Sequence, residues 1–194
     1  MVSVSASIGA AMGALAGYYG GIIDEAISRV IDILLAFPGL LLAIALVAVL
    51  GPSLTNVVIA LSLIGWVGYA RVARAQVLQA REFEYVVAAR AIGAATPRIL
   101  IRHVLPAALP ALTVQATLGM GGAILSEAAL SFLGLGVQPP TPSWGAMLNY
   151  GRVHVLDAPH LTVFPGLAIA VVVLGLNLLG DSLRDRLGGA EGSS

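Results

Sequence analysis

The chain has 194 residues, of which 58% are hydrophobic and only 10% are charged. A water-soluble domain usually carries about 25% charged residues, so this composition excludes a soluble globular protein and indicates that lipid is the solvent. Ten arginines balance ten acidic residues, and there is no lysine. Cysteine is also absent, which excludes disulfides, thiolate metal sites and cysteine nucleophiles.

The first apolar segment covers residues 2–23 and consists mainly of small residues. Glycine recurs there at every fourth position, at Gly9, Gly13, Gly17 and Gly21. Residues spaced by four share one face of a helix, and a stripe of small residues lets a neighbouring backbone approach closely. The spacing therefore predicts a tight helix–helix contact along this stripe. A generic small-residue membrane helix is the alternative.

The second apolar segment covers residues 30–50 and comes after a short polar turn at residues 24–29. Pro38 interrupts it, and a proline kinks a helix because it removes a backbone hydrogen bond. The kink could line a passage across the membrane or could be a packing adjustment, and the sequence favours neither. Pro38 is therefore a candidate pathway or gating residue.

Three further membrane spans are predicted, over residues 56–77, 107–135 and 161–180. A proline-rich and then polar connection at 136–160 separates the last two, and a Gly/Ser tail ends the chain. The expected fold is therefore an all-α polytopic membrane protein with about five transmembrane helices, organised as a single domain over residues 1–194.

Glu127 lies inside the span predicted over residues 107–135. Carboxylates within membrane spans are rare and often functional, so Glu127 is a candidate pathway or gating residue. A carboxyl group satisfied by neighbouring helices is the alternative, and both stay open. His154 and His160 flank a loop and match no ligand spacing, so no metal site is expected.

The arginines predict how the chain is oriented. Six of the ten lie in residues 71–102, two lie close to the C-terminus, and the connection 136–160 has one. Because cytoplasmic loops are enriched in arginine and lysine, the loop 81–106 and the C-terminus are expected in the cytoplasm, with 136–160 outside. Five spans then put the N-terminus outside, which predicts that a further span precedes Met1 in the full gene product.

The loop between the third and fourth spans is expected to form a helix, a sharp turn and a second helix. Alanine and glutamate favour a helix over residues 82–92, and its apolar positions have helical spacing: Phe83, Val86, Val87 and Ala91. Gly93 can end this helix in the left-handed conformation. Thr96 and Pro97 then offer an N-cap and a proline at the first helical position. Such an elbow can enter a groove on another protein; an amphipathic hairpin lying on lipid headgroups is the alternative.

The same loop resembles the Glu-Ala-Ala (EAA) loop of ABC-type import permeases. The matching residues are Ala88, Ala89, Gly93, His103, Leu105 and Pro106. Further similarity extends over nearly the whole chain, most specifically in Glu-Ala-Ala-Leu-Ser-Phe-Leu-Gly-Leu-Gly-Val-Gln-Pro-Pro-Thr-Pro-Ser-Trp-Gly at 127–145. This similarity is to the dipeptide/oligopeptide/nickel permease family and, within it, to the second of the two permease subunits. Two departures are that Val87 replaces the family's glutamate and that family members have one more N-terminal span.

The resemblance implies a permease subunit of an ATP-driven importer for peptides or related small solutes, in the cytoplasmic (inner) membrane. A homologous permease would complete the pathway, ATPase subunits carrying ATP and magnesium would dock on the loop around 85–106, and an extracytoplasmic binding protein would deliver the solute. The chain itself is expected to bind no cofactor and no nucleic acid. It has no Gly-x-x-x-x-Gly-Lys phosphate loop, so it is not expected to hydrolyse ATP.

Two other interpretations stay open. One is a self-contained secondary transporter or channel, which would want paired intramembrane charges and an internal repeat, and the sequence has neither. The other is a truncated permease remnant without transport function. The sequence does not distinguish among dipeptides, longer peptides, nickel complexes and glutathione as the solute.

Overall fold

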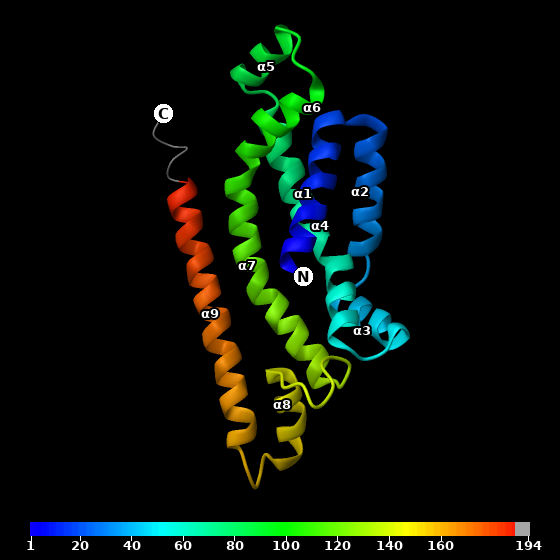
Figure 1. Cartoon of the computed structure of the whole chain (residues 1–194), viewed down its shortest axis with the longest axis vertical. Helices are drawn as coiled ribbons and strands as arrows, with labels where there is room; N and C mark the ends of the chain where they lie inside the picture. The colour runs from blue at the N-terminus through cyan, green and yellow to red at the C-terminus, as the bar shows by residue number, and fades with distance from the viewer. Residues whose placement is uncertain (189–194) are drawn as a thin grey trace. The chain divides into compact units, whose positions relative to one another are not determined.

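A computed structural model describes residues 1–188, whose regular elements are all helical, as expected. Residues 189–194, the end of the Gly/Ser tail, lie outside the described residues. The α-helices are α1 (Val2–Tyr19), α2 (Gly21–Leu35), α3 (Gly39–Leu50), α4 (Leu54–Ala80), α5 (Glu84–Ala91), α6 (Thr96–Ile99), α7 (Leu105–Phe132), α8 (Trp144–Gly151) and α9 (His160–Gly188) (Figure 1). A π-helical turn (Leu100–Val104) joins α6 to α7, and a 3₁₀ turn (Arg152–His154) comes directly after α8.

Three helices of the described chain are long and apolar enough to cross a membrane, or four if the bent pair α2 and α3 is one span. The three are Leu54–Ala80, Thr96–Phe132 and His160–Leu187. This count is lower than the five predicted. The α1 helix is not among the candidates, because its many serines and glycines dilute its apolar character. The second predicted span is divided into α2 and α3, and Pro38 stands directly before α3 rather than inside a kinked helix.

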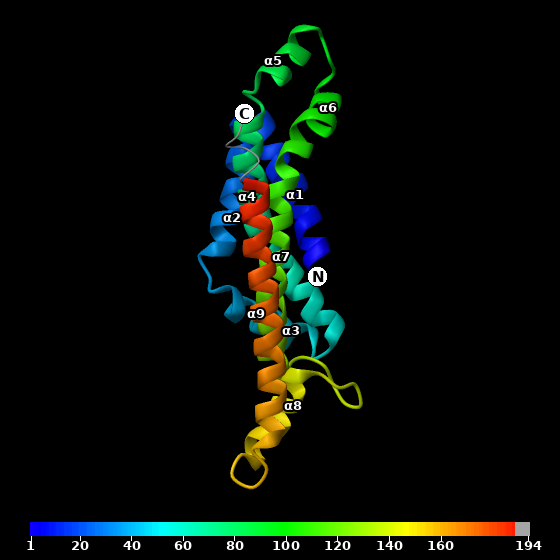
Figure 2. The same ribbon diagram turned by 90° about the vertical axis from the view of Figure 1, so that its left-hand side faces the viewer.

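The chain divides into two compact units. One, here called the loop unit, comprises residues 3–36, 65–116 and the chain from Asp181. It holds α1, α2, most of α4, the α5–α6 hairpin and the start of α7. The α1 helix lies along α4 in both Figure 1 and Figure 2.

Glycines set the close approach of α1 to α4 within the loop unit. A Cβ atom added to Gly9 would lie 2.5 Å from the backbone oxygen of Trp66, and one on Gly17 would lie 2.8 Å from that of Arg74. Gly13 is as tightly packed, against the backbone oxygen of Ala70. The two helices thus meet backbone to backbone, as the four-residue spacing predicts.

Gly21 does not continue this stripe, which corrects the prediction. The α1 helix ends at Tyr19, and both Gly20 (φ 65°) and Gly21 (φ 53°) have the positive φ that a side chain would resist. No atom lies within 4 Å of the place where a Cβ of Gly21 would be. Gly21 therefore serves the turn into α2 and not the helix contact.

The other unit, here called the cavity unit, comprises residues 1–2, 37–64 and 117–180. Its core includes Val47 of α3, Val57 and Ala60 of α4, and Leu130 of α7, each at most 1% exposed. The connection 136–160, predicted as proline-rich and then polar, contains α8. Ser143 caps this helix by accepting a hydrogen bond from the backbone N–H of Ala146 at 3.1 Å.

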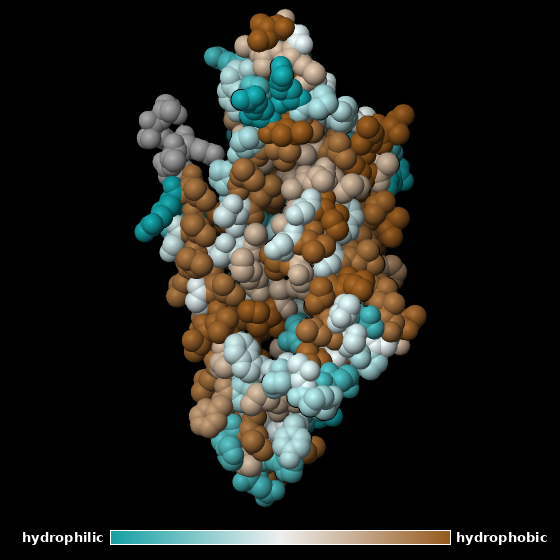
Figure 3. Space-filling view, in the orientation of Figure 1, coloured by the Kyte–Doolittle hydropathy of each residue, from teal (hydrophilic) through white to brown (hydrophobic). Residues whose placement is uncertain are grey.

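Large apolar side chains are exposed along the helices of both units. Ile22 is 86% exposed and Val49 is 87% exposed. Figure 3 shows apolar surface over the long helices, with hydrophilic residues gathered at the α5–α6 hairpin and around α8. Soluble monomers rarely expose so much apolar surface, so the surface agrees with a lipid environment.

Candidate functional site

The predicted turn after α5 is present, and the backbone defines it fully. The N–H of Ala94 donates to the carbonyl of Ala89 at 3.1 Å, and the N–H of Gly93 donates to the carbonyl of Arg90 at 3.0 Å. This pair of bonds is the Schellman motif, which requires a left-handed residue after the helix. Gly93 supplies it with φ of 80°. The elbow is therefore fixed by hydrogen bonds and by glycine, and not by side-chain packing at its tip.

The inward face of α5 differs from the prediction. Val86 is fully buried and Ala89 is 7% exposed, and both pack in a cluster with Ile99 and Val104 from the second half of the loop. The other apolar residues of the predicted set face outward: Phe83, Val87 and Ala91. Sequence spacing could not select the buried pair, because most positions of this short helix are apolar or alanine.

The predicted coupling-loop residues of α5 thus separate into two groups. Ala89 is buried, whereas Val87, Ala88 and Gly93 are exposed. Ile92 stands at the tip with 86% of its surface exposed. The tip of the elbow therefore presents apolar side chains beside exposed charged ones, such as Glu84 and Arg90.

The second half of the loop begins one residue earlier than predicted. Ala95 precedes the helix in an extended conformation, and no side chain caps it, so Thr96 is the first helical residue and not an N-cap. Pro97 is next, in the first turn, where the missing N–H of proline is tolerated. The predicted proline start is therefore present, while the threonine cap is wrong.

The remaining predicted loop residues lie where the loop becomes α7. The N–H of Leu105 donates to the carbonyl of Leu100, five residues back, which closes the π-helical turn. Pro106 is the next residue and has no N–H of its own, and wide turns of this kind are a common cause of helix bends. The His103 ring lies 6.3 Å from the Tyr85 ring, and its Nδ1 is buried without a hydrogen-bond partner among the described residues.

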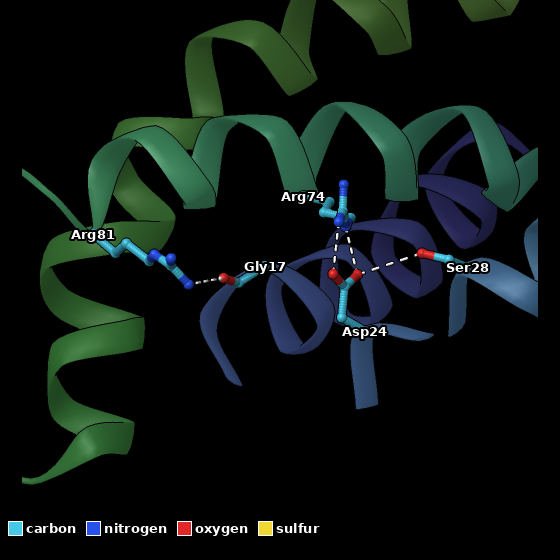
Figure 4. A network of polar contacts seen from close by, with 5 residues as sticks. All are labelled: Gly17, Asp24, Ser28, Arg74 and Arg81. Atoms are coloured by element: carbon cyan, nitrogen blue, oxygen red, sulfur yellow. Dashed lines mark hydrogen bonds and ion pairs between the residues drawn. The ribbon is translucent and has the colours of Figure 1, made fainter. Parts of the chain in front are cut away.

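An ion pair that the sequence did not predict connects α2 to α4 within the loop unit. Arg74 donates from Nε to Asp24 Oδ1 at 2.5 Å and from Nη2 to Asp24 Oδ2 at 2.6 Å, and Ser28 also donates to this carboxylate (Figure 4). Arg81 donates to the backbone oxygen of Gly17 at 3.1 Å. The two arginines therefore connect the end of α4 to α1 and α2 instead of only extending towards lipid headgroups.

The cavity unit contains a cavity of about 560 Å³, and Glu127 is part of its wall. The lining residues are mostly apolar: Met1, Val57, Val58, Leu61, Ala123, Ile124, Glu127, Pro142, Ser143, Trp144 and Met147. Glu127 Oε1 accepts a hydrogen bond from Ser131 Oγ at 2.6 Å. The carboxylate is thus both partly satisfied within its own helix and placed at a cavity. Pro38 is not among the lining residues of this cavity.

The histidines of the 136–160 region do not form a metal centre. The His154 ring lies 5.2 Å from the Tyr150 ring, and His160 begins α9. Within residues 1–188, no three His, Asp or Glu side chains gather in a way that could hold a metal ion.

The fold matches that of a chain in a solved ABC transporter. A solved chain of the MetNI methionine ABC transporter in an inward-facing conformation superposes with a TM-score of 0.73 at 19% identity, covering 96% of this chain and 88% of that chain. A second MetNI structure gives a TM-score of 0.69 at 18% identity, covering 96% and 92% of the two chains. At this identity the similarity concerns the fold alone.

The chain belongs to the family of binding-protein-dependent transport system inner membrane components, whose sequence profile matches residues 9–189. Curated relatives agree with the permease family that the loop and the 127–145 string predict. The dipeptide transport system permease protein DppC of Alkalihalophilus pseudofirmus is 51% identical over 179 residues, which are 92% of this chain and 59% of that protein.

Two glutathione transport system permease proteins GsiD are similarly close. The protein of Pectobacterium atrosepticum is 47% identical over 186 residues, covering 96% of this chain and 62% of that protein. The protein of Escherichia coli is 50% identical over 186 residues, covering 96% of this chain and 61% of that protein. The chain thus spans about three fifths of the length of these relatives.

Proposed function

We propose that this chain is a permease subunit of an ATP-driven importer for peptides or related small solutes. In this proposal it forms half of the translocation pathway, and a homologous permease forms the other half. Family membership supports the proposal, and the observation that carries it is the exposed elbow at Gly93. A rigid, solvent-facing turn within an arginine-rich loop is suited to contact a partner outside the lipid.

The partner proposed for the elbow is the ATPase subunit, which holds the ATP and magnesium. The buried side of α5 supports this coupling role: Val86 packs in one cluster with Val77 of α4 and with Val104, the last residue of the π-helical turn that leads into α7. A close-packed interior transmits displacement instead of absorbing it. A push on the exposed side of α5 would therefore reach two long helices directly.

The proposed orientation places the loop and the C-terminus in the cytoplasm and the 136–160 region outside. An extracytoplasmic binding protein would then contact the chain near α8 and the proline-rich segment that precedes it. The positive-inside asymmetry of the arginines supports this arrangement. The proposed location is the cytoplasmic (inner) membrane, as for an inner membrane component.

The proposed solutes are small peptides. The DppC and GsiD relatives carry names for dipeptide and glutathione transport, and both kinds of solute have a free α-ammonium group at neutral pH. Solute choice within this class is left to the binding protein.

Co-purification and transport assays test the proposal against a self-contained carrier. The tagged chain is expressed with a second permease and ATPase subunits of the same transporter family, purified in detergent and reconstituted with a binding protein. An importer subunit retains the ATPases, and uptake into the proteoliposomes requires ATP and survives collapse of ion gradients. A self-contained carrier retains no ATPase and loses uptake when the gradients collapse, and that result would reject the proposal.

A further inference from the structure

We propose that the Glu127 cavity is a solute subsite that recognises a primary ammonium group, with Glu127 as its anionic anchor and Trp144 as its aromatic wall. The inference rests on the proposed function, because it assigns the cavity to the transport pathway. It goes further by naming the chemical group that the cavity selects.

The cavity has the character of a binding site for a small organic cation. Its volume of about 560 Å³ is within the usual range of small-molecule sites, about 300–1,000 Å³, which are mostly apolar with a few placed polar groups. Here Glu127 and Ser143 are the polar side chains of the wall. Among the described residues, no arginine or histidine side chain lines it, so its one ionisable side chain is the Glu127 carboxylate, which can pair with an ammonium group.

The hydrogen bonds around Glu127 leave room for such a partner. The backbone N–H of Val137 donates to Ser131 Oγ at 3.2 Å, and Ser131 Oγ lies 2.6 Å from Glu127 Oε1. Because the Ser131 hydroxyl already accepts one bond, its own proton is free to point to Glu127. The carboxylate therefore has one hydroxyl donor on Oε1, and no described residue donates to Oε2. A charged group in an apolar wall is strongly stabilised by a second, cationic donor.

The part of the cavity wall formed by α8 is held firmly in place. Gly145 packs so closely on α7 that a Cβ there would lie 2.7 Å from Ser131 Cβ. Trp144 and Met147 belong to the same helix and line the cavity. Because the carboxylate and the indole are carried by two tightly packed helices, the site is preformed. An ammonium group near an indole face gains additional electrostatic attraction.

Ligand binding to the full chain in lipid nanodiscs tests the inference without requiring transport. The probes are leucinamide, which has a primary ammonium group and no carboxylate, and N-acetyl-leucinamide, which lacks the charge. The chain has two tryptophans, so emission is recorded for the wild type and for Trp144→Phe to isolate the Trp144 signal. Met1 also lines the cavity, so every variant carries its affinity tag at the C-terminus.

The expected result is a saturable change in Trp144 emission with leucinamide and a much weaker one with the acetylated probe. Glu127→Gln should weaken leucinamide binding about tenfold to hundredfold, the usual effect of losing a charged hydrogen-bond partner. Binding of the acetylated probe should not change. Glu127→Asp keeps the charge and should recover part of the affinity, which also covers the case in which Glu127→Gln does not fold.

Three results would overturn the inference: equal affinity for the two probes, unchanged leucinamide binding in Glu127→Gln, or no saturable binding of either probe. The results that would reject the importer proposal differ from those that would reject the subsite. Loss of ATPase retention with binding that still depends on Glu127 rejects the importer and keeps the subsite, whereas normal ATP-driven uptake without such binding rejects the subsite alone.

Discussion

The same helix-ending motif occurs in both units of the molecule, with different surroundings. The α5 helix ends at a turn that contains Gly93 with φ of 80°, and the α7 helix ends at a turn that contains Gly134 with φ of 81°. In both motifs the residue after the glycine donates its N–H to a carbonyl five residues back, at 3.1 Å in the first and 2.9 Å in the second. The backbone geometry of the two turns is therefore nearly the same.

The two turns differ in the packing of the chain beyond the glycine. Ile92 and Gly93 are exposed, and nothing packs against the tip. After Gly134 the chain instead folds back onto α7: a Cβ on Gly136 would lie 2.7 Å from Ser131 Cα, and Val137 is buried. One turn leaves its elbow exposed, and the other holds the serine that donates to Glu127. The local motif decides where a helix ends, and the surrounding packing decides what the end can do.

The largest expected effect is at the buried turn. Gly136→Val would put side-chain atoms inside the van der Waals envelope of Ser131, and overpacking of this kind destabilises strongly. We expect little folded protein, measured as the yield of monodisperse chain in detergent. Gly122→Ala is the matched control, since no atom lies within 4 Å of that position, and it should behave like the wild type. Normal yield of Gly136→Val would contradict the tight packing of this turn on α7.

The next effect is functional and concerns the exposed turn. Gly93→Val should abolish ATP-driven uptake while membrane insertion stays normal, because a β-branched residue distorts the left-handed elbow on which docking is proposed to depend. Gly51→Val also forces a positive φ (92°) on a valine at an uncrowded position, and it controls for backbone strain alone. Uptake is measured per folded protein in reconstituted vesicles. Normal uptake by Gly93→Val would remove the docking assignment from this loop.

A smaller effect is expected at the Asp24–Arg74 pair of the loop unit. Double-mutant cycles with Asp24→Asn and Arg74→Gln should give a coupling of about 1 kcal/mol in the free energy of unfolding, since the pair is bidentate but partly exposed. The exposed Glu25–Arg29 pair serves as control and should show no measurable coupling. Equal coupling in the two pairs would mean that the Asp24–Arg74 pair stabilises the fold no more than an exposed surface pair does.

The contrast between the two turns also explains how much of the molecule could be predicted. The turn at Gly93 results from local backbone chemistry, so the sequence predicted its position and conformation. The buried face of α5 depends on Ile99 and Val104, and the partner of Asp24 lies 50 residues away in the chain. Neither of these long-range contacts leaves a local pattern in the sequence.

The site around Glu127 was predictable only in part. A carboxylate within an apolar span marked the residue, but the cavity is assembled from α4, α7 and α8, and α8 itself was not predicted. Its one local indication was a serine before a short apolar run, the pattern of an N-cap at Ser143. The expected span before Met1 and the cytoplasmic C-terminus stay predictions.

The absence of cysteine allows a direct test of the docking proposal, because each single-cysteine variant carries one thiol. Ile92→Cys and Leu156→Cys both replace highly exposed residues, 86% and 96% exposed, in different units. Each is labelled with a photoreactive maleimide in membranes that contain the partner permease and ATPases. We expect Ile92→Cys to cross-link to the ATPase subunit and Leu156→Cys not to. Cross-linking of Leu156→Cys alone, or labelling of Ile92→Cys by an impermeant reagent from outside intact cells, would contradict the account.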